Sequence, residues 1–294
     1  GQPLTGQITP SGNKNAALPL MAACMLTDQP IILHNVPRIR DVRTMLQLLA
    51  DLGVDISEPD EHSLHLRAAN VRKTKLDPDL CREIRASILL AGPMLARLKS
   101  VELPPPGGDV IGRRRVDTHF LALTRLGAEV EINHEFRMRA DRLIGCDILL
   151  DEASVTGTEN AIMAAVTAHG TTILRNAASE PHVQELCLML NQMGTQIDGI
   201  GSNTLTIYGV TALHGAEFTI GPDYSEIGSY IGLAAITGGE ITIHNSAPQH
   251  LSMVRLVFER LGVKFEMRGD DLFVARGQSL TVVPDIGGAI PKID

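Results

Sequence analysis

The feature of this sequence that most restricts its fold is an internal repeat with a period of about 70 residues. Each copy contains an alanine-rich segment, a short β-branched run that ends in His-Asn or Arg-Asn, a polar loop, an amphipathic segment, a glycine and a second β-rich run. Three copies are clear, at residues 22–56, 164–197 and 234–265, and a degenerate copy lies at 85–130. Because this period is too long for a solenoid, we expect each copy to be an α/β unit that packs against its neighbours.

The pattern inside a copy predicts its helices and strands. Met45, Leu48 and Leu52 recur at helical spacing and form one apolar stripe. The short runs 31–33 and 241–243 are β-branched, which is typical of strands. Each copy should therefore hold two helices and three or four strands. A glycine suited to the left-handed conformation that ends a helix closes each amphipathic segment, at Gly53, Gly127, Gly194 and Gly262.

The alanine-rich segments predict a second kind of helix. Residues 16–25, 161–168 and 231–235 have almost no polar face, so we expect these helices to be buried, near the axis of their domain. The fold class is accordingly α/β (α+β). A Gly-Pro pair follows the third copy, which makes residues 210–221 the expected domain boundary.

Composition excludes several classes of protein. Aromatic residues make up 3% of the 294 residues and tryptophan is absent, so a base-stacking surface is not expected. A formal charge of −8 likewise argues against a nucleic-acid partner. The N-terminal residues show no leader pattern and no apolar run is long enough to cross a membrane, so we expect a soluble, cytoplasmic protein without a membrane partner. The cysteines lack the spacing of a metal site or a disulfide framework and are expected to be reduced thiols, at Cys24, Cys81, Cys146 and Cys187.

Two segments have the residue types of an anion-binding site. Lys14 precedes the first alanine-rich helix, where the helix macrodipole opposes a cation but an anionic ligand would favour one. Residues 103–115 form a proline-glycine loop that ends in three arginines. Its glycines would let the backbone approach a ligand and its arginines would hold a phosphate or carboxylate. The alternatives are a solvated lysine and a surface loop with solvated charges.

Other candidates have simpler explanations. Arg82 and Arg85 lie on one helix face, which is usual for a solvated surface. Residues 154–160 carry hydroxyl groups at the start of a helix, suited to capping or to binding a phosphate. The histidines lack metal-ligand spacing and are expected to be structural or solvated, among them His34, His119 and His244.

Several motifs, taken in order, resemble one known family. These motifs are residues 6–19 (Gly-Gln-Ile-Thr-Pro-Ser-Gly-Asn-Lys-Asn-Ala-Ala-Leu-Pro), residues 106–109 (Pro-Gly-Gly-Asp) and residues 156–160 (Thr-Gly-Thr-Glu-Asn). Shorter matches at residues 33–45, 85–88 and 222–223 follow the same order. The sequence is similar over nearly its whole length to the UDP-N-acetylglucosamine 1-carboxyvinyltransferases, a family of enolpyruvyl transferases.

The resemblance implies a fold that is built from such repeats. The family has an inside-out α/β barrel, with two domains of three repeat units each and an active site in the cleft between them. On that template residues 13–221 form a complete domain, and residues 1–12 with 222–294 form part of a second domain, which we expect to be incomplete in this chain.

The resemblance also implies an activity and a set of site residues. The family transfers enolpyruvyl from phosphoenolpyruvate to the 3′-hydroxyl of UDP-N-acetylglucosamine with release of phosphate, the first committed step of peptidoglycan synthesis, without a metal or cofactor. Lys14 and Asn15 match the contacts to phosphoenolpyruvate, and Arg114 a loop arginine that faces both substrates. The residues that match contacts to the nucleotide sugar are Arg85, Arg114, Arg115, Val116, Asp117, Thr118, Ser154, Val155, Thr156 and Gly157.

The sequence departs from the family pattern in three respects. Asp109 occupies the general-acid position, where most members carry cysteine, so we expect insensitivity to fosfomycin, which alkylates that cysteine. Glu152 and Tyr224 stand where basic residues are common. The base is a family aspartate, and because the context of Asp294 fits it poorly we expect the base beyond the last residue.

Two other functions remain open from the sequence. One is transfer to shikimate 3-phosphate by the related 5-enolpyruvylshikimate-3-phosphate synthases, which lack the Gly-Gly-Asp loop. The other is a non-catalytic UDP-sugar-binding protein, suggested by Glu152 and Tyr224. The oligomeric state is not predicted.

Overall fold

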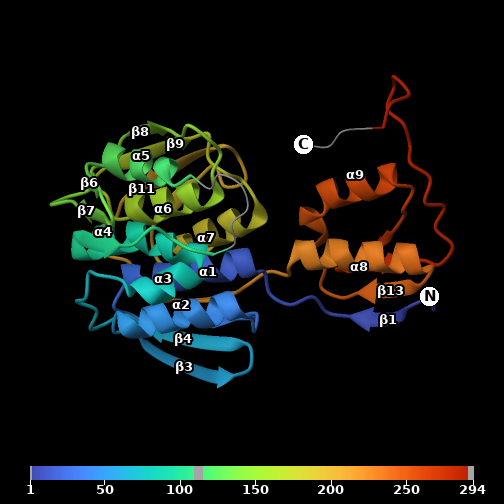
Figure 1. Cartoon of the computed structure of the whole chain (residues 1–294), viewed down its shortest axis with the longest axis horizontal. Coiled ribbons are helices and arrows are strands. Elements are labelled where there is room, and N and C mark those ends of the chain that lie inside the picture. Colours follow the sequence, from blue (N-terminus) through green and yellow to red (C-terminus); the bar gives the residue numbers. More distant parts are fainter. Residues whose placement is uncertain (1, 109–114, 291–294) are drawn as a thin grey trace. The chain divides into compact units, whose positions relative to one another are not determined.

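The computed structural model describes residues 2–108 and 115–290 and divides the chain into two compact units (Figure 1). Unit 2 consists of residues 14–220, and unit 1 joins residues 1–13 to residues 221–294.

Unit 2 contains three successive copies of the repeat. The first comprises α1 (Lys14–Ala23), η1 (Cys24–Leu26), β2 (Ile31–His34), α2 (Arg40–Asp51), β3 (Asp55–Asp60) and β4 (Ser63–Arg67). The second comprises α3 (Pro78–Glu83), η2 (Arg85–Leu90), α4 (Ala91–Leu98), β5 (Ser100–Leu103), α5 (Asp117–Arg125), β6 (Glu129–Ile132) and β7 (Phe136–Arg139). The third comprises β8 (Asp147–Leu149), α6 (Val155–Ala165), β9 (Thr171–Arg175), α7 (Pro181–Gln192), β10 (Gln196–Asp198), β11 (Thr204–Tyr208) and β12 (Ala216–Thr219).

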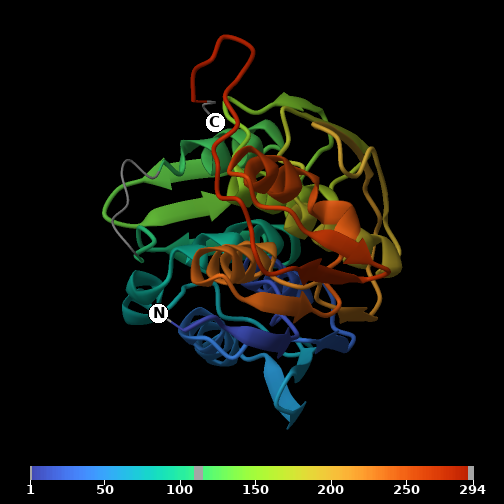
Figure 2. The same ribbon diagram turned by 90° about the vertical axis from the view of Figure 1, so that its right-hand side faces the viewer.

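Unit 1 is built from both ends of the chain. Its elements are β1 (Thr5–Ile8), α8 (Tyr224–Thr237), β13 (Glu240–Ile243), η3 (Pro248–His250), α9 (Ser252–Arg260), β14 (Glu266–Arg268) and β15 (Asp271–Val274). The N-terminal strand β1 lies parallel to β13, so the blue and orange strands run side by side (Figure 2).

The four sheets repeat one topology. The strand orders are β12-β2-β4-β3, β8-β9-β11-β10 and β1-β13-β15-β14, and in each the first pair is parallel and the other two are antiparallel. The degenerate copy forms the three-stranded sheet β5-β7-β6, and an isolated parallel bridge from Lys75 to Glu102 stands where the others have a fourth strand. Within the described residues each sheet has the predicted three or four strands and each clear copy the predicted two α-helices, whereas the degenerate copy has α3 in addition to α4 and α5.

Backbone conformation repeats with the sequence. The predicted helix-ending glycines Gly53, Gly127, Gly194 and Gly262 have φ of 95°, 103°, 103° and 79°. The asparagine of the recurring His-Asn or Arg-Asn pair is also left-handed in each clear copy, with φ of 56° at Asn35, 56° at Asn176 and 51° at Asn245. Asparagine tolerates this conformation better than most residues, which accounts for its recurrence at the end of the strand.

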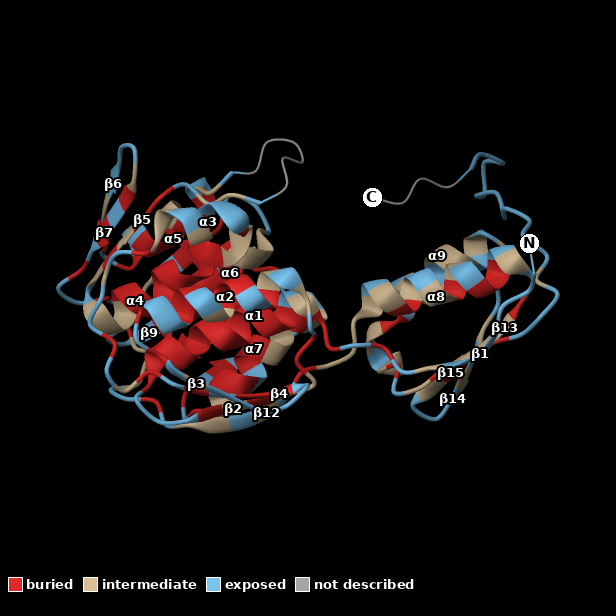
Figure 3. Ribbon diagram, turned by 60° about the horizontal axis from the view of Figure 1, so that its bottom comes forward, coloured by how far each residue is buried: buried red, intermediate tan, exposed pale blue. Residues whose placement is uncertain are grey.

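The alanine-rich helices of unit 2 are buried, as predicted. Every residue from Ala16 to Ala23 in α1 and from Gly157 to Ala165 in α6 is buried. The sheets of unit 2 lie around these helices (Figures 1 and 3). The helices α1 and η2–α4 run parallel, because η2 contacts α1 while α4 contacts η1 at the far end of α1.

The same prediction is only half right for α8 in unit 1. Ile231, Ala234 and Ala235 are buried against β13 and β15, but Leu233 and Ile236 on the other face are 39% and 74% exposed (Figure 3). One sheet and the short helix α9 cover a single side of α8, whereas the helices of unit 2 are surrounded.

The cysteines are reduced and most of them are buried, as expected. All four cysteines are free, and burial raises the pKa of Cys24, Cys81 and Cys187 to about 12. Within residues 2–108 and 115–290, no helix combines the length and the apolar character needed to cross a membrane.

Candidate active site

Three of the predicted site segments lie at one end of unit 2. Lys14 and Asn15 begin α1, Arg85 begins η2, and Ser154 caps α6. The far ends of these helices meet elsewhere, because Leu26, Ala96 and Thr167 line one cavity there. The helix starts therefore share the opposite end of the unit, and their N–H groups and partial positive charge favour an anion.

Lys14 lies at the first position of α1, as predicted. Its Nζ is 3.2 Å from Oδ2 of Asp41 in the first turn of α2, and both side chains are partly exposed. The carboxylate of Asp41 offsets the repulsion between this lysine and the start of its own helix. Lys14 is therefore held at this end of the unit while it keeps access to solvent.

Ser154 is the N-cap residue of α6. Its Oγ accepts a hydrogen bond of 3.2 Å from the N–H of Gly157, so the capping alternative for this side chain is confirmed. A Cβ at Gly157 would lie 3.0 Å from Ser154 Oγ and 3.0 Å from Thr118 Cγ2, which explains the small residue. The N–H groups of Val155 and Thr156 precede the first intrahelical bond and point out of the helix end.

A network of charged and hydroxyl side chains joins the start of α5 to this turn. Arg115 donates from Nε to Asp117 at 2.8 Å and from Nη2 to Asp151 at 3.0 Å. Thr118 Oγ1 donates to the other oxygen of Asp151 at 2.7 Å. Arg85 Nη2 donates to the backbone carbonyl of Arg115 at 2.8 Å. The structure thus brings together Arg85, Arg115, Asp117 and Thr118 of the predicted nucleotide-sugar set.

The charged groups of this network alter one another's pKa. The hydrogen bond from Arg115 lowers the pKa of the Asp117 carboxyl, and Asp117 raises the pKa of Arg115, with Asp151 and Glu152 adding to the effect. Glu152 is therefore close enough to Arg115 to raise its pKa. Asp151 was not predicted as a site residue, and only its place before the capped turn pointed to it.

Gly107 and Gly108 of the proline-glycine loop approach the protein's own backbone. Gly107 N–H donates to the Cys81 carbonyl at 3.0 Å and Gly108 N–H to the Arg82 carbonyl at 3.2 Å. A Cβ at Gly107 would lie 1.8 Å from the carbonyl oxygen of Arg82. The prediction was that these glycines let the backbone approach a ligand. The structure instead gives Gly107 and Gly108 a structural role at the base of the loop. Asp109, Arg113 and Arg114 lie outside the described residues, as does Asp294.

Two histidines pair with carboxylates of neighbouring strands. His34 Nε2 is 2.8 Å from Glu217 Oε1, and His244 Nδ1 is 2.8 Å from Asp271 Oδ2. The equivalent Arg175 pairs with Asp147 at 2.9 Å. The contacts of His34 and Arg175 are equivalent, because each reaches a parallel strand, whereas Asp271 lies on the antiparallel strand β15. Both histidine contacts are structural, as predicted. His119 is different, because it is buried beside the turn before α6.

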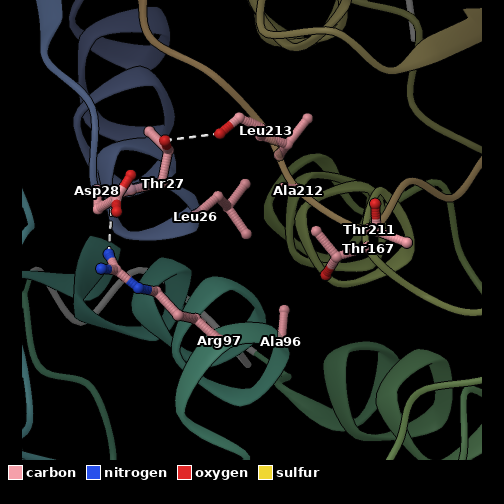
Figure 4. A pocket seen from close by; sticks show the side chains of 9 residues that line it. All are labelled: Leu26, Thr27, Asp28, Ala96, Arg97, Thr167, Thr211, Ala212 and Leu213. Atoms are coloured by element: carbon pink, nitrogen blue, oxygen red, sulfur yellow. Dashed lines mark hydrogen bonds between the residues drawn. The ribbon is translucent and has the colours of Figure 1, made fainter.

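The cavity at the far end of unit 2 is lined by the helix C-termini (Figure 4). It measures about 380 Å³. Arg97 donates from Nη1 to the carbonyls of Met25 and Thr27 at 3.1 and 2.8 Å, which satisfies helix-end acceptors. None of the predicted site residues that the structure describes lines this cavity.

The family is shown by comparison with known proteins. The chain matches the family model of EPSP synthase (3-phosphoshikimate 1-carboxyvinyltransferase) over residues 1–290. It belongs to this family, and its class is that of the carboxyvinyltransferases.

Comparison with individual relatives is more specific than the match to the family model. The chain is 56% identical to the UDP-N-acetylglucosamine 1-carboxyvinyltransferase of Treponema denticola, 52% identical to that of Bradyrhizobium diazoefficiens and 50% identical to that of Borreliella burgdorferi. Each match covers the whole of this chain and 68–69% of the relative. The chain thus spans about two thirds of the length of these relatives.

Solved structures share the fold at low sequence identity. The enolpyruvyl transferase NikO from Streptomyces tendae superposes with a TM-score of 0.81 at 20% identity, over 94% of this chain and 66% of that one. An EPSP synthase from Acinetobacter baumannii superposes with a TM-score of 0.74 at 18% identity, over 97% and 67%. The predicted mixed α/β enolpyruvyl transferase fold is confirmed.

Proposed function

We propose that this protein transfers the enolpyruvyl group of phosphoenolpyruvate to the 3′-hydroxyl of UDP-N-acetylglucosamine and releases phosphate, at the entry to peptidoglycan synthesis. The observation that carries the proposal is the identity of 50–56%, across the whole chain, with enzymes named for this acceptor. The helix starts and cations at one end of unit 2 suit two anionic substrates although the protein as a whole is acidic.

Lys14 and Asn15 bind phosphoenolpyruvate in this proposal. A lysine at the first position of a buried helix places a full positive charge beside the N–H groups of that helix. The charge and the N–H groups both favour binding of a phosphate. Asp41, 3.2 Å away, holds the ammonium in place until the substrate arrives.

The nucleotide sugar is bound by the network at the start of α5 and α6. Arg85, Arg115, Asp117 and Thr118 belong to this network, and Val116 precedes α5. The first turn of α6 offers its N–H groups to the diphosphate. Arg114 adds a cation that both substrates share.

Asp109 acts as general acid. It gives its proton to C3 of phosphoenolpyruvate, the sugar oxygen bonds to C2, and a base takes the hydroxyl proton. The tetrahedral intermediate then loses a proton from C3 and expels phosphate, which restores the double bond. A carboxyl group does not form the thioether that a cysteine forms with an epoxide, so the enzyme is insensitive to fosfomycin.

The test is product analysis with the full-length protein. Incubation with phosphoenolpyruvate and UDP-N-acetylglucosamine should give the enolpyruvyl ether of the sugar nucleotide by mass spectrometry, together with one equivalent of phosphate. Binding of the sugar nucleotide without any product would favour the non-catalytic alternative and overturn the proposal.

A further inference from the structure

A buried amide with only one possible orientation lies between α4 and α6. Asn160 is fully buried; its Oδ1 accepts from the N–H of Gly92 at 2.7 Å, and its Nδ2 donates to the carbonyl of Ile88 at 2.8 Å. A backbone N–H only donates and a carbonyl only accepts, so the two ends of this amide are not interchangeable.

The orientation of Asn160 fixes the protonation of His119. His119 Nδ1 is 2.8 Å from Asn160 Nδ2, which has only hydrogens to offer, so Nδ1 accepts and the ring proton is on Nε2. Burial, with the nearby charge of Arg85, lowers the pKa of His119 to about 3. The imidazole is therefore neutral near pH 7.

The proton on His119 Nε2 points at Thr156. The distance from Nε2 to Thr156 Oγ1 is 3.1 Å, and the ring is 1% exposed while the threonine is only partly buried. Because Oγ1 accepts from the ring, the hydroxyl proton of Thr156 is directed elsewhere. Within the parts of the chain that the structure describes, it has no acceptor.

We propose that His119 is a positioning residue that turns the hydroxyl of Thr156 outward, so that this hydroxyl donates to the diphosphate of the nucleotide sugar beside the first N–H groups of α6. This inference rests on the proposed function. Asn160 acts one step further back, because it decides which ring nitrogen carries the proton. With the other tautomer, Nε2 would accept the Thr156 proton and remove the donor from the site.

Kinetics of variants separate this role from a structural one. Thr156→Val should raise KM for UDP-N-acetylglucosamine about tenfold, as expected for a lost hydrogen bond to a charged acceptor, and leave KM for phosphoenolpyruvate unchanged. His119→Leu should have a similar effect, and His119→Gln, which keeps a donor at the ε position, should recover most of it. The matched control is Thr167→Val, in the turn that follows the other end of α6 and equally half-buried.

The double variant decides the matter. If His119 acts through Thr156, His119→Leu adds less than twofold to KM in the Thr156→Val background. If the increases in KM of the two single variants multiply in the double variant, His119 does not act through Thr156 and the inference is overturned. An equal increase in KM for both substrates would show a structural role and would also overturn it. Thr156→Val without effect on either KM would refute diphosphate binding at this turn, and absence of product from the wild-type protein would refute the proposed function itself.

The tautomer gives a readout that does not depend on any variant folding. Nitrogen-15 NMR of the wild-type protein labelled at histidine should show His119 neutral with its proton on Nε2 throughout pH 6–8. A proton on Nδ1, or titration of His119 in this range, would overturn the inference.

Discussion

Thr118 Oγ1 donates a hydrogen bond of 2.7 Å to Asp151 Oδ1, and this bond joins the start of α5 to the turn before α6. The other oxygen of Asp151 accepts from Arg115. One carboxylate therefore orients a hydroxyl and a guanidinium that belong to the proposed nucleotide-sugar site.

Asp151→Asn should weaken binding of the sugar nucleotide. An amide that accepts from Arg115 with its oxygen presents its NH₂ group to Thr118, so the Thr118 hydrogen bond reverses and Arg115 loses its charged partner. We expect KM for UDP-N-acetylglucosamine to rise about tenfold, the scale of one hydrogen bond to a charged group, with kcat changed less. Asp147→Asn, which breaks the exposed pair with Arg175, is the matched control and should leave KM unchanged. Equal KM values in the two variants would remove Asp151 from the site.

Replacement of Asp109 tests the general acid. Asp109→Asn should reduce kcat by about 10²–10⁴, since an amide cannot deliver the proton. Circular dichroism should be unchanged. Asp109→Cys should restore part of the activity and make the enzyme sensitive to fosfomycin, with a mass increase of one inhibitor adduct. Covalent labelling of the wild-type protein at Asp109 would contradict the assignment.

Gly107→Ala should disturb the base of the loop that carries Asp109. The new Cβ would lie 1.8 Å from the carbonyl oxygen of Arg82, so the backbone must move, at a cost of about 1–3 kcal/mol. Thermal unfolding and kcat should both decrease. Gly6→Ala is the control, because a Cβ there meets nothing within 4 Å. A Gly107→Ala protein as stable and active as the control would show that the loop base tolerates displacement.

Glu159 should make stability depend on pH. Its side chain is buried in α6, and Oε1 has no hydrogen-bond partner among the residues that the structure describes. Burial, with the charge of Glu180, raises its pKa well above the ordinary 4.5. A carboxyl with a raised pKa in the folded state contributes its full stability below about pH 4.5. That stability is lost as the pH rises toward the folded-state value.

Glu159→Gln should therefore be more stable than wild type by a margin that grows between pH 5 and pH 8, by up to about 1.4 kcal/mol per pH unit. Urea unfolding followed by circular dichroism at the two pH values measures this margin. A margin that is the same at both would mean that the carboxyl is ionised in the folded protein.

The repeat made much of the fold predictable, because it fixes local conformation. Gly53 and its counterparts end helices, and the apolar spacing of Met45 and Leu48 marks α2, so periodicity alone located these elements. The exposure of Ile236 was not predictable, since burial of an apolar helix depends on how many sheets surround it.

The candidate site was predictable only in part. Lys14 and the turn at Ser154 follow from helix starts, which are local signals. Asp151 and His119 act through contacts with residues far along the chain, and nothing in their sequence spacing indicates the partner. The close approach of Gly107 to Arg82 is likewise a tertiary contact, which a glycine count cannot assign to ligand or backbone.

The central claim is the identity of the acceptor, and phosphate release from phosphoenolpyruvate by the full-length protein tests it most directly. We predict release that depends on UDP-N-acetylglucosamine and is absent with shikimate 3-phosphate. Release with shikimate 3-phosphate, or none with the sugar nucleotide under conditions where it binds, would contradict the account.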